Sequence, residues 1–268
     1  MSILQTILDH KRTTEVPARR AAVPLADVRR AAEAAPPARD FAAALRRSDG
    51  RVALIAEVKR ASPSRGVLAR GAWAPADLAR RYEANGASCV SVLTDERFFM
   101  GSLEDLRAVR GAIGLPVLRK DFVVDAYQLY EARAAGADAA LLIVAALEDQ
   151  ALCDLHALAR ELALTALVEV HDEAEAERAR KAGAGVIGVN NRDLRTFTLD
   201  LETTRRCAAQ LRGVPGLTLV SESGIFAPAQ VAAVAGMGAH AILVGEALIT
   251  AGDLATQTRA LADVPRAG

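Results

Sequence analysis

The chain has 268 residues, of which 51% are hydrophobic and 25% charged. This composition supplies a large apolar core and excludes global disorder, and the length is close to the roughly 250 residues of a barrel of eight βα units. Lys plus Arg equal Asp plus Glu at 33 each, which removes the basis for non-specific binding to nucleic acid or to an anionic membrane surface. We expect a protein that acts on small molecules, with no nucleic-acid or membrane partner.

The cysteines and the N-terminus bear on the cellular compartment. Cys89, Cys153 and Cys207 are odd in number and lack CxxC spacing, which favours buried free thiols in a reducing cytoplasm over a disulfide framework or a zinc site. Asp9 lies where a signal peptide would have its apolar core. The longest apolar run, residues 139–147, is far shorter than the ~20 residues that span a bilayer. A cytoplasmic protein is therefore expected.

The first fifty residues differ from the rest of the chain in their residue pattern. They contain Ala-, Leu- and Arg-rich stretches of helical character, with prolines at Pro17 and Pro24 and a Pro36-Pro37 pair. Proline removes a backbone donor and disfavours the helical conformation of the preceding residue, so helices are expected to break at these positions. The pattern predicts an N-terminal extension of short helices.

From residue 51 onward, β-rich runs alternate with stretches of helical period. The eight runs are residues 52–58, 89–94, 115–120, 139–144, 164–170, 185–190, 217–223 and 241–246. Asp125 is a candidate N-cap of one intervening helix. Four helix exits share a Gly-Ala step, at Gly86, Gly136, Gly183 and Gly238, where glycine supplies the left-handed residue that ends a helix.

Strands that are apolar on both faces and separated by helices indicate a parallel sheet covered by helices. Eight such units favour closure into a (β/α)8 TIM barrel over an open doubly wound sheet, which the sequence leaves as an alternative. The units use all of the chain after the extension. We therefore predict one α/β domain over residues 1–268, a (β/α)8 barrel with residues 1–48 as an N-terminal helical extension. We expect this extension to lie over the barrel and to help shape the substrate pocket without supplying proton chemistry.

Polar side chains interrupt the runs at the carboxyl ends of the strands, where a barrel has its active site. They are Glu57, Lys59, Lys120, Asp121, Glu169, Asn190, Asn191, Arg192, Glu222 and Glu246. Only four of the 33 basic residues are lysines, and Lys59 and Lys120 both lie at strand ends, unlike Lys11 and Lys181. Because the pKa of an ammonium group can be tuned, a lysine there suggests proton donation. Each residue alone fits a rim ion pair or a solvated charge equally well, but their convergence favours catalysis.

Glycine turns after the last two strands suit a phosphate. Ser223 and Gly224 follow the seventh run and Gly245 ends the eighth, where many barrels bind phosphate through backbone N–H groups and a helix N-terminus. The GxGxxG pattern at residues 183–188 precedes and enters a strand instead of opening a helix. It therefore does not indicate a dinucleotide site, and no NAD or flavin is expected.

Histidines and aromatic residues add two expectations. The histidines, His10, His156, His171 and His240, lack metal-ligand spacing, so packing or solvent-facing roles and no metal are expected. Phe98, Phe99 and Phe122 lie just past strand ends in a chain that is only 4% aromatic. These phenylalanines suggest a pocket for a flat ring.

Several sequence blocks together resemble one family. They are ILDHKR (7–12), IAEVKRASPSRG (55–66), LRKDF (118–122), LLIV (141–144), LVEVHDE (167–173), GVNNRDL (188–194), SESGI (221–225) and VGEAL (244–248). In register they resemble indole-3-glycerol phosphate synthase of tryptophan biosynthesis, over nearly the whole chain. The resemblance implies a cofactor-free carboxy-lyase, a monomer or weak homo-oligomer, that converts 1-(2-carboxyphenylamino)-1-deoxyribulose 5-phosphate into indole-3-glycerol phosphate, carbon dioxide and water.

The resemblance also implies roles for individual residues. Lys120 would be the general acid that activates the ketone, Glu169 would move protons in the dehydration, and Lys59 would hold the anionic groups of the substrate. Glu57, Asn190 and Glu222 would orient these groups. The implied substrate-binding residues are Ser62, Pro63, Phe99, Phe122, Leu142, Arg192 and Leu194, and the implied phosphate-binding residues are Ser223, Gly224, Gly245 and Glu246. The loop over residues 60–72, rich in Ser, Pro and Gly, is a candidate lid.

Two other readings remain open on the residues alone. One is another phosphosugar barrel enzyme, such as an isomerase of the same pathway or an aldolase that forms a lysine Schiff base. The other is a phosphate-ligand-binding scaffold or partner subunit without catalysis. Reduction with borohydride would trap an aldolase substrate covalently, whereas formation of indole fluorescence would identify the synthase.

Overall fold

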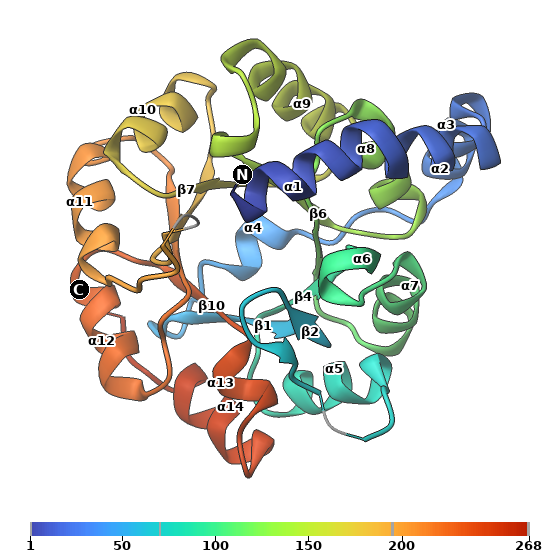
Figure 1. The fold of residues 1–268 in the computed structure, drawn as a ribbon. Helices are drawn as coiled ribbons and strands as arrows, with labels where there is room; N and C mark the ends of the chain where they lie inside the picture. The colour runs from blue at the N-terminus through green and yellow to red at the C-terminus, as the bar shows by residue number, and fades with distance from the viewer. Residues whose placement is uncertain (1, 70, 194–195, 267–268) are drawn as a thin grey trace.

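The structure, a computed structural model, describes residues 2–69, 71–193 and 196–266 and has a closed parallel barrel at its centre (Figure 1). Its strands are β1 Ala53–Val58, β4 Cys89–Leu93, β5 Val117–Lys120, β6 Ala139–Ile143, β7 Thr165–Val170, β8 Val186–Asn190, β9 Thr218–Glu222 and β10 Ala241–Val244. They pair in the order β1-β10-β9-β8-β7-β6-β5-β4, and β4 returns to β1 through the register Ile55↔Cys89. This closure confirms the (β/α)8 barrel and excludes the open doubly wound sheet.

Helices surround the barrel, as expected for strands that are buried on both faces. The main ones are α5 Pro75–Ala84, α7 Leu103–Ala112, α8 Ala126–Ala134, α9 Asp149–Glu161, α10 Glu173–Lys181, α11 Glu202–Gln210, α12 Pro228–Gly236 and α14 Leu254–Ala262. Shorter turns are α6 Glu96–Phe99, η2 Val144–Ala146 and α13 Glu246–Ile249. Asp125 caps α8 in a capping box with Gln128. All four Gly-Ala exits have a glycine with positive φ, as the sequence predicts.

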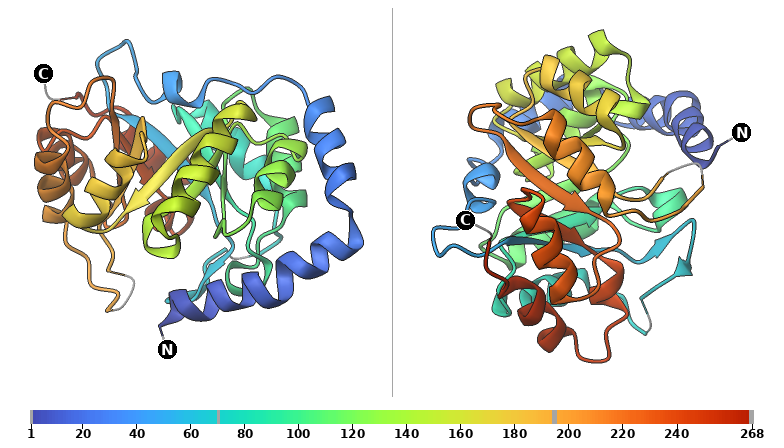
Figure 2. Two further views of the ribbon diagram at one scale, coloured as in Figure 1. Left: turned by 90° about the horizontal axis from the view of Figure 1, so that it is seen from above. Right: turned by 90° about the vertical axis from the view of Figure 1, so that its left-hand side faces the viewer.

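The N-terminal segment is helical but is interrupted at fewer positions than its prolines predict. It comprises α1 Ile3–His10, the π-helical turn η1 Lys11–Glu15, α2 Val16–Ala22, α3 Leu25–Ala34 and α4 Phe41–Ala44. The chain stays helical through Pro17 because this proline falls in the first turn after the π turn, where its missing N–H is tolerated. Helix α2 ends just before Pro24. Figure 2 shows α1 and α2 as one long rod across one end of the barrel.

Two local features differ from expectation. The loop over residues 60–72 contains a short antiparallel hairpin, β2 Ala61–Ser62 with β3 Gly66–Val67, which the sequence did not predict. Cys89 and Cys207 are buried free thiols, but Cys153 is exposed because it lies on the outer face of α9, whose Leu152 and Leu155 face inward.

Across the described residues, we find no helix with the length and apolarity needed to cross a membrane.

Candidate active site

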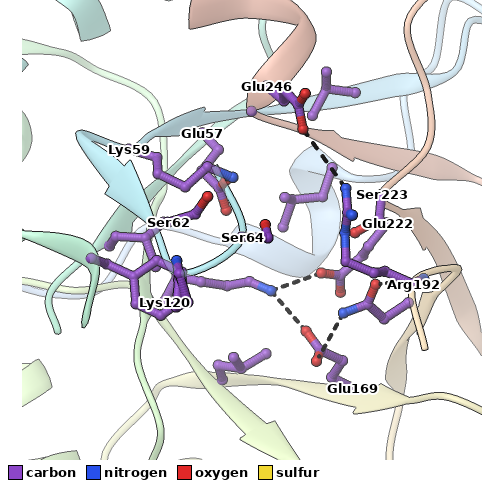
Figure 3. A pocket seen from close by; sticks show the side chains of 18 of the residues that line it. Glu57, Lys59, Ser62, Ser64, Lys120, Glu169, Arg192, Glu222, Ser223 and Glu246 are labelled. Carbon is purple, nitrogen blue, oxygen red and sulfur yellow. Dashed lines mark hydrogen bonds and ion pairs between the residues drawn. The ribbon is translucent and has the colours of Figure 1, made fainter. Parts of the chain in front are cut away.

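A cavity lies at the carboxyl ends of the barrel strands, where parallel barrels carry their sites (Figure 3). Its charged and amide lining consists of Glu57, Lys59, Lys120, Asp121, Glu169, Asn190, Arg192, Glu222 and Glu246. These residues come from β1, β5, β7, β8, β9 and the turn after β10. The structure thus brings to one cavity all six residues that the resemblance implies to be catalytic.

Lys120 is at the centre of the polar lining. Its Nζ lies 2.7 Å from Glu169 Oε2 and 2.8 Å from Glu222 Oε2, so one ammonium joins the ends of β5, β7 and β9. Asn190 Nδ2 donates to Glu169 Oε1 at 3.3 Å. Lys120 and its two carboxylate partners are almost completely enclosed, and Lys120 keeps 12% of its side-chain surface open towards the cavity. This geometry holds a proton donor at the floor of the cavity.

The electrostatics of this group follow from burial and from the excess of carboxylates. Burial disfavours the charged form of Lys120, but the negative charges of Glu169, Glu222 and Glu57 outweigh burial and raise its pKa. The pKa of Glu169 is lowered, because Lys120 and His171 together outweigh the effect of burial. Burial, with the charges of Glu169 and Glu57, raises the pKa of Glu222 to about 7 in spite of Lys120. Glu222 can therefore exchange a proton near neutral pH.

Glu57 and Lys59 form a second ion pair at the end of β1. They lie two residues apart and so point to the same side of the chain. Gly245 is packed against this pair, since a Cβ atom at residue 245 would collide with Glu57 Oε1 and come within 3.0 Å of Lys59 Nζ. Glycine at this position therefore keeps the two side chains and the backbone after β10 in close contact.

The predicted phosphate-binding residues line the same cavity, and one of them, Gly245, is packed against this ion pair. Ser223 and Gly224 both have positive φ, at 67° and 78°, which turns the backbone sharply after β9. The carboxylate of Glu246 pairs with two arginines. Arg65 Nε donates to its Oε1 at 2.9 Å, and Arg192 Nη2 lies 3.7 Å from its Oε2. Because a carboxylate repels phosphate, Glu246 can assist an anion only through its backbone N–H.

Apolar side chains also line the cavity. Phe99 and Phe122 face each other with ring centroids 6.0 Å apart, and Pro63 from the hairpin loop joins them, with Ser62 beside it. Phe98 instead packs edge-on against His10. A flat aromatic ring fits a wall of this kind.

Two of the implied substrate-binding residues are not among the described residues that line the cavity. Leu142 is corrected: it is fully buried on the outer side of β6, and its neighbours Leu141 and Ile143 line the cavity instead, because alternate strand residues face opposite sides. Leu194 lies outside the described residues.

The N-terminal extension contributes to the cavity, as expected, since Ile3, Leu4 and Ile7 of α1 line it. One contribution to the site, that of His171, was not foreseen from the sequence. His171, expected in a packing or solvent-facing role, lies beside Glu169, with Nε2 3.4 Å from Glu169 Oε1 and Nδ1 3.0 Å from Glu175 Oε2. Burial opposes charge on this imidazole, but the two glutamates raise the pKa of His171 to about 10. Its position two residues after Glu169 was the available signal, because such residues share a strand face.

Comparison with known proteins decides the family. A model of the family described as indole-3-glycerol phosphate synthase matches residues 4–261. The chain belongs to the indole-3-glycerol phosphate synthase family. A relative named indole-3-glycerol phosphate synthase from Roseiflexus sp. (strain RS-1) is 56% identical, over 97% of this chain and 98% of its own length. Another of the same name, from Mycobacteroides abscessus, is 53% identical over 100% of this chain and 95% of its own length.

Among solved structures, the thiamine phosphate pyrophosphorylase from Pyrococcus furiosus superposes with a TM-score of 0.59. The match covers 78% of this chain and 93% of that protein at 18% sequence identity. At this identity the likeness concerns the barrel fold alone. Membership of the synthase family rests instead on the full-length sequence matches.

Proposed function

We propose that this chain is an indole-3-glycerol phosphate synthase, which converts 1-(2-carboxyphenylamino)-1-deoxyribulose 5-phosphate into indole-3-glycerol phosphate with release of carbon dioxide and water. The observation that carries this proposal is Lys120, held at 2.7 Å from Glu169 and 2.8 Å from Glu222 on the floor of a cavity with one aromatic wall. Family membership at more than 50% identity supports the same reaction.

Lys120 acts as the general acid in the ring closure. Attack by the aromatic carbon places negative charge on the ketone oxygen, and an ammonium within reach stabilises that oxygen and gives it a proton. The neighbouring carboxylates keep Lys120 protonated, because their charges raise its pKa. The same effect argues against an aldolase, since a Schiff base requires the neutral amine.

The other residues of the lining complete the reaction. Glu169, kept ionised by Lys120 and His171, accepts and returns protons during the dehydration. Lys59 binds the anionic groups of the substrate, Glu57 orients Lys59, and Asn190 holds Glu169 by the hydrogen bond at 3.3 Å. Glu222, with its pKa near neutrality, supports Lys120.

Substrate binding divides between two sides of the cavity. The phosphate is held by the backbone around Ser223, Gly224 and Gly245, where glycine lets an anion approach the N–H groups closely. The anthranilate ring packs against Phe99 and Phe122, which exclude water from it. Arg192 lies at the rim and contributes the charge that attracts the substrate.

The remaining proposals concern organisation. Residues 1–268 act as one domain in which residues 1–48 form the helical extension, because the helices of this extension contribute Ile3, Leu4 and Ile7 to the cavity. The enzyme works without a cofactor or metal, as a monomer or weak homo-oligomer in the cytoplasm, and without a nucleic-acid partner, in keeping with its balanced charge.

The direct test is incubation of the purified protein with the carboxyphenylamino deoxyribulose phosphate, followed by indole fluorescence. Product should form at a rate proportional to enzyme concentration, with one carbon dioxide released per indole. A parallel reaction with borohydride should leave the mass of the protein unchanged. Absence of indole, or a covalent adduct on Lys120 after reduction, would contradict the synthase reaction and favour the aldolase.

A further inference from the structure

Lys11 is buried among carboxylates but has no role in the proposed reaction. It lies in the N-terminal helix, far in sequence from every barrel strand, yet its side chain is completely buried. A buried ammonium is costly unless it is paired and hydrogen-bonded. The partners of Lys11 therefore indicate what its burial accomplishes.

Three carboxylates from three parts of the chain surround Lys11. Its Nζ lies 2.9 Å from Glu15 Oε1, 2.9 Å from Asp95 Oδ2 and 2.7 Å from Asp121 Oδ1. Asp95 follows β4 and caps α6, the helix that ends at Phe99. Asp121 directly follows Lys120, the proposed acid. One ammonium thus joins the N-terminal helix to the ends of two adjacent barrel strands.

The contacts of Asp121 carry this connection to the aromatic wall. Asp121 Oδ1, which binds Lys11, also accepts from the backbone N–H of Phe122 at 2.8 Å. Its Oδ2 accepts from Thr94 at 2.7 Å and from Arg119 at 3.0 Å. The position of Lys11 is therefore coupled to the backbone that bears both Lys120 and Phe122.

On the helix itself, Lys11 lies one turn after Ile7, which lines the cavity together with Ile3 and Leu4. Lys11 is also the first residue of the π turn Lys11–Glu15. Such turns are rare and occur frequently at functional sites. The ion cluster and the apolar face of α1 therefore belong to one rigid arrangement.

We propose that Lys11 is a positioning residue that docks α1 as a wall of the substrate cavity and fixes the segment after β5 that carries Lys120 and Phe122. A purely stabilising role explains the cluster less well, because buried ion pairs contribute little net stability compared with apolar residues, whereas they can select one arrangement over others. The structural part of this proposal stands alone, and only its kinetic consequence rests on the proposed function.

The test uses the full-length enzyme and the variant Lys11→Met, which keeps a similar length and removes the charge. Arg30→Met is the matched control, because Arg30 is another cation of the extension, 75% exposed and paired with Asp27 on its own helix. Amide hydrogen exchange is measured over residues 3–10 and, as an internal reference, over residues 25–34. The values of kcat and KM are measured well below the melting temperature of each variant.

In Lys11→Met, exchange over residues 3–10 should accelerate at least tenfold while that over residues 25–34 stays unchanged. KM should rise about tenfold, because the α1 wall is lost, and kcat should fall several-fold, because the segment after β5 relaxes. Arg30→Met should match the wild type in all three measurements. A Lys11→Met protein with a lowered melting temperature but wild-type exchange and kinetics would overturn the proposal.

If Lys11→Met does not fold, Lys11→Met combined with Asp95→Asn removes one charge of each sign and keeps an oxygen to cap α6. The same exchange and kinetic criteria then apply to this double variant. Hydrogen exchange needs no substrate, so it tests the docking of α1 even if the wild-type enzyme proves inactive on the carboxyphenylamino deoxyribulose phosphate. Inactivity of the wild type would contradict the proposed function, whereas unchanged exchange would contradict the role of Lys11.

Discussion

Two buried lysines are held by carboxylates at the end of β5, Lys120 by Glu169 and Glu222 and Lys11 by three carboxylates that include Asp121. Lys120 faces the cavity with 12% of its side-chain surface open, whereas Lys11 has none. Around Lys11, Asp121 has a pKa well below its usual range, because Lys11 and Arg119 outweigh burial. Around Lys120, the pKa of Glu222 is raised to about 7. Similar side chains thus serve two purposes. Around Lys11 the carboxylate of Asp121 stays ionised and the cluster is structural, whereas around Lys120 the carboxylate of Glu222 can exchange a proton.

The strongest test of this contrast is Lys120→Met, which removes both charge and proton from the cavity. We expect kcat to fall by roughly 10³–10⁴-fold, because acid catalysis and stabilisation of the ketone oxygen are lost together. The melting temperature should fall as well, since the variant leaves the enclosed carboxylates of Glu169 and Glu222 without their shared cation. Rates of indole formation and far-UV circular dichroism measure the two effects.

Lys120→Arg is the matched control, because it keeps the charge and cannot release a proton near neutral pH. If Lys120 is the acid, this variant should remain severely slowed while still binding a product analogue. Recovery of most of the rate would show that charge alone suffices, and the two lysines would then differ only in their access to substrate.

A second test asks whether Glu169 moves a proton or only holds Lys120. Glu169→Gln keeps the shape and a hydrogen-bond acceptor but removes the basic carboxylate. Turnover should fall by about 10²–10⁴-fold, the usual cost of losing acid–base catalysis, with KM nearly unchanged. Steady-state kinetics at several pH values provide the measurement. A variant that retained most of its activity would place Glu169 among the fixed groups, like Asp121.

The smallest expected effect concerns stability and Glu222. Its folded pKa of about 7 lies above the ordinary value of 4.5, so the folded state binds a proton that the unfolded state has lost between these pH values. The burial of Glu222 therefore lowers the free energy of unfolding as pH rises from about 4.5 to 7. Glu222→Gln should melt roughly 2–6 °C above the wild type at pH 8, with little difference at pH 4.5. An equal shift at both pH values would show that Glu222 is not the titrating group.

Most of the barrel was readable from the sequence because its signals are local. Each strand begins and ends within a few residues of its predicted run, and the glycines at the helix exits have the expected positive φ. The residues at strand ends converge because parallel strands bring all their carboxyl ends to one side. Lys120, Glu169 and Glu222 could therefore be placed together without knowing any distance.

The remaining features depend on contacts between distant segments. No periodicity shows that Lys11 meets Asp121, because this contact joins residues more than a hundred positions apart. The expectation that the extension shapes the pocket did not identify Ile3, Leu4 and Ile7 as the residues that line it. Leu142 was misassigned because a block of four apolar residues does not reveal which of them face inward. The role of His171 could not be predicted from metal-ligand spacing, because that spacing carries no information on an imidazole that pairs with a carboxylate.

The π turn Lys11–Glu15 lets α1 and α2 present different faces to the barrel. A π turn accommodates one extra residue, and each residue advances an α-helix by about 100°, so the part beyond Glu15 is rotated by about that angle from an unbroken helix. This rotation lets α1 face the cavity while the carbonyl of Arg19 in α2 receives a hydrogen bond from Tyr127 of α8. A regular α-helix through residues 11–15 could not give both α1 and α2 these orientations. Deletion of one residue from the π turn would therefore restore regular α-helical hydrogen bonding and turn Ile3, Leu4 and Ile7 away from the cavity.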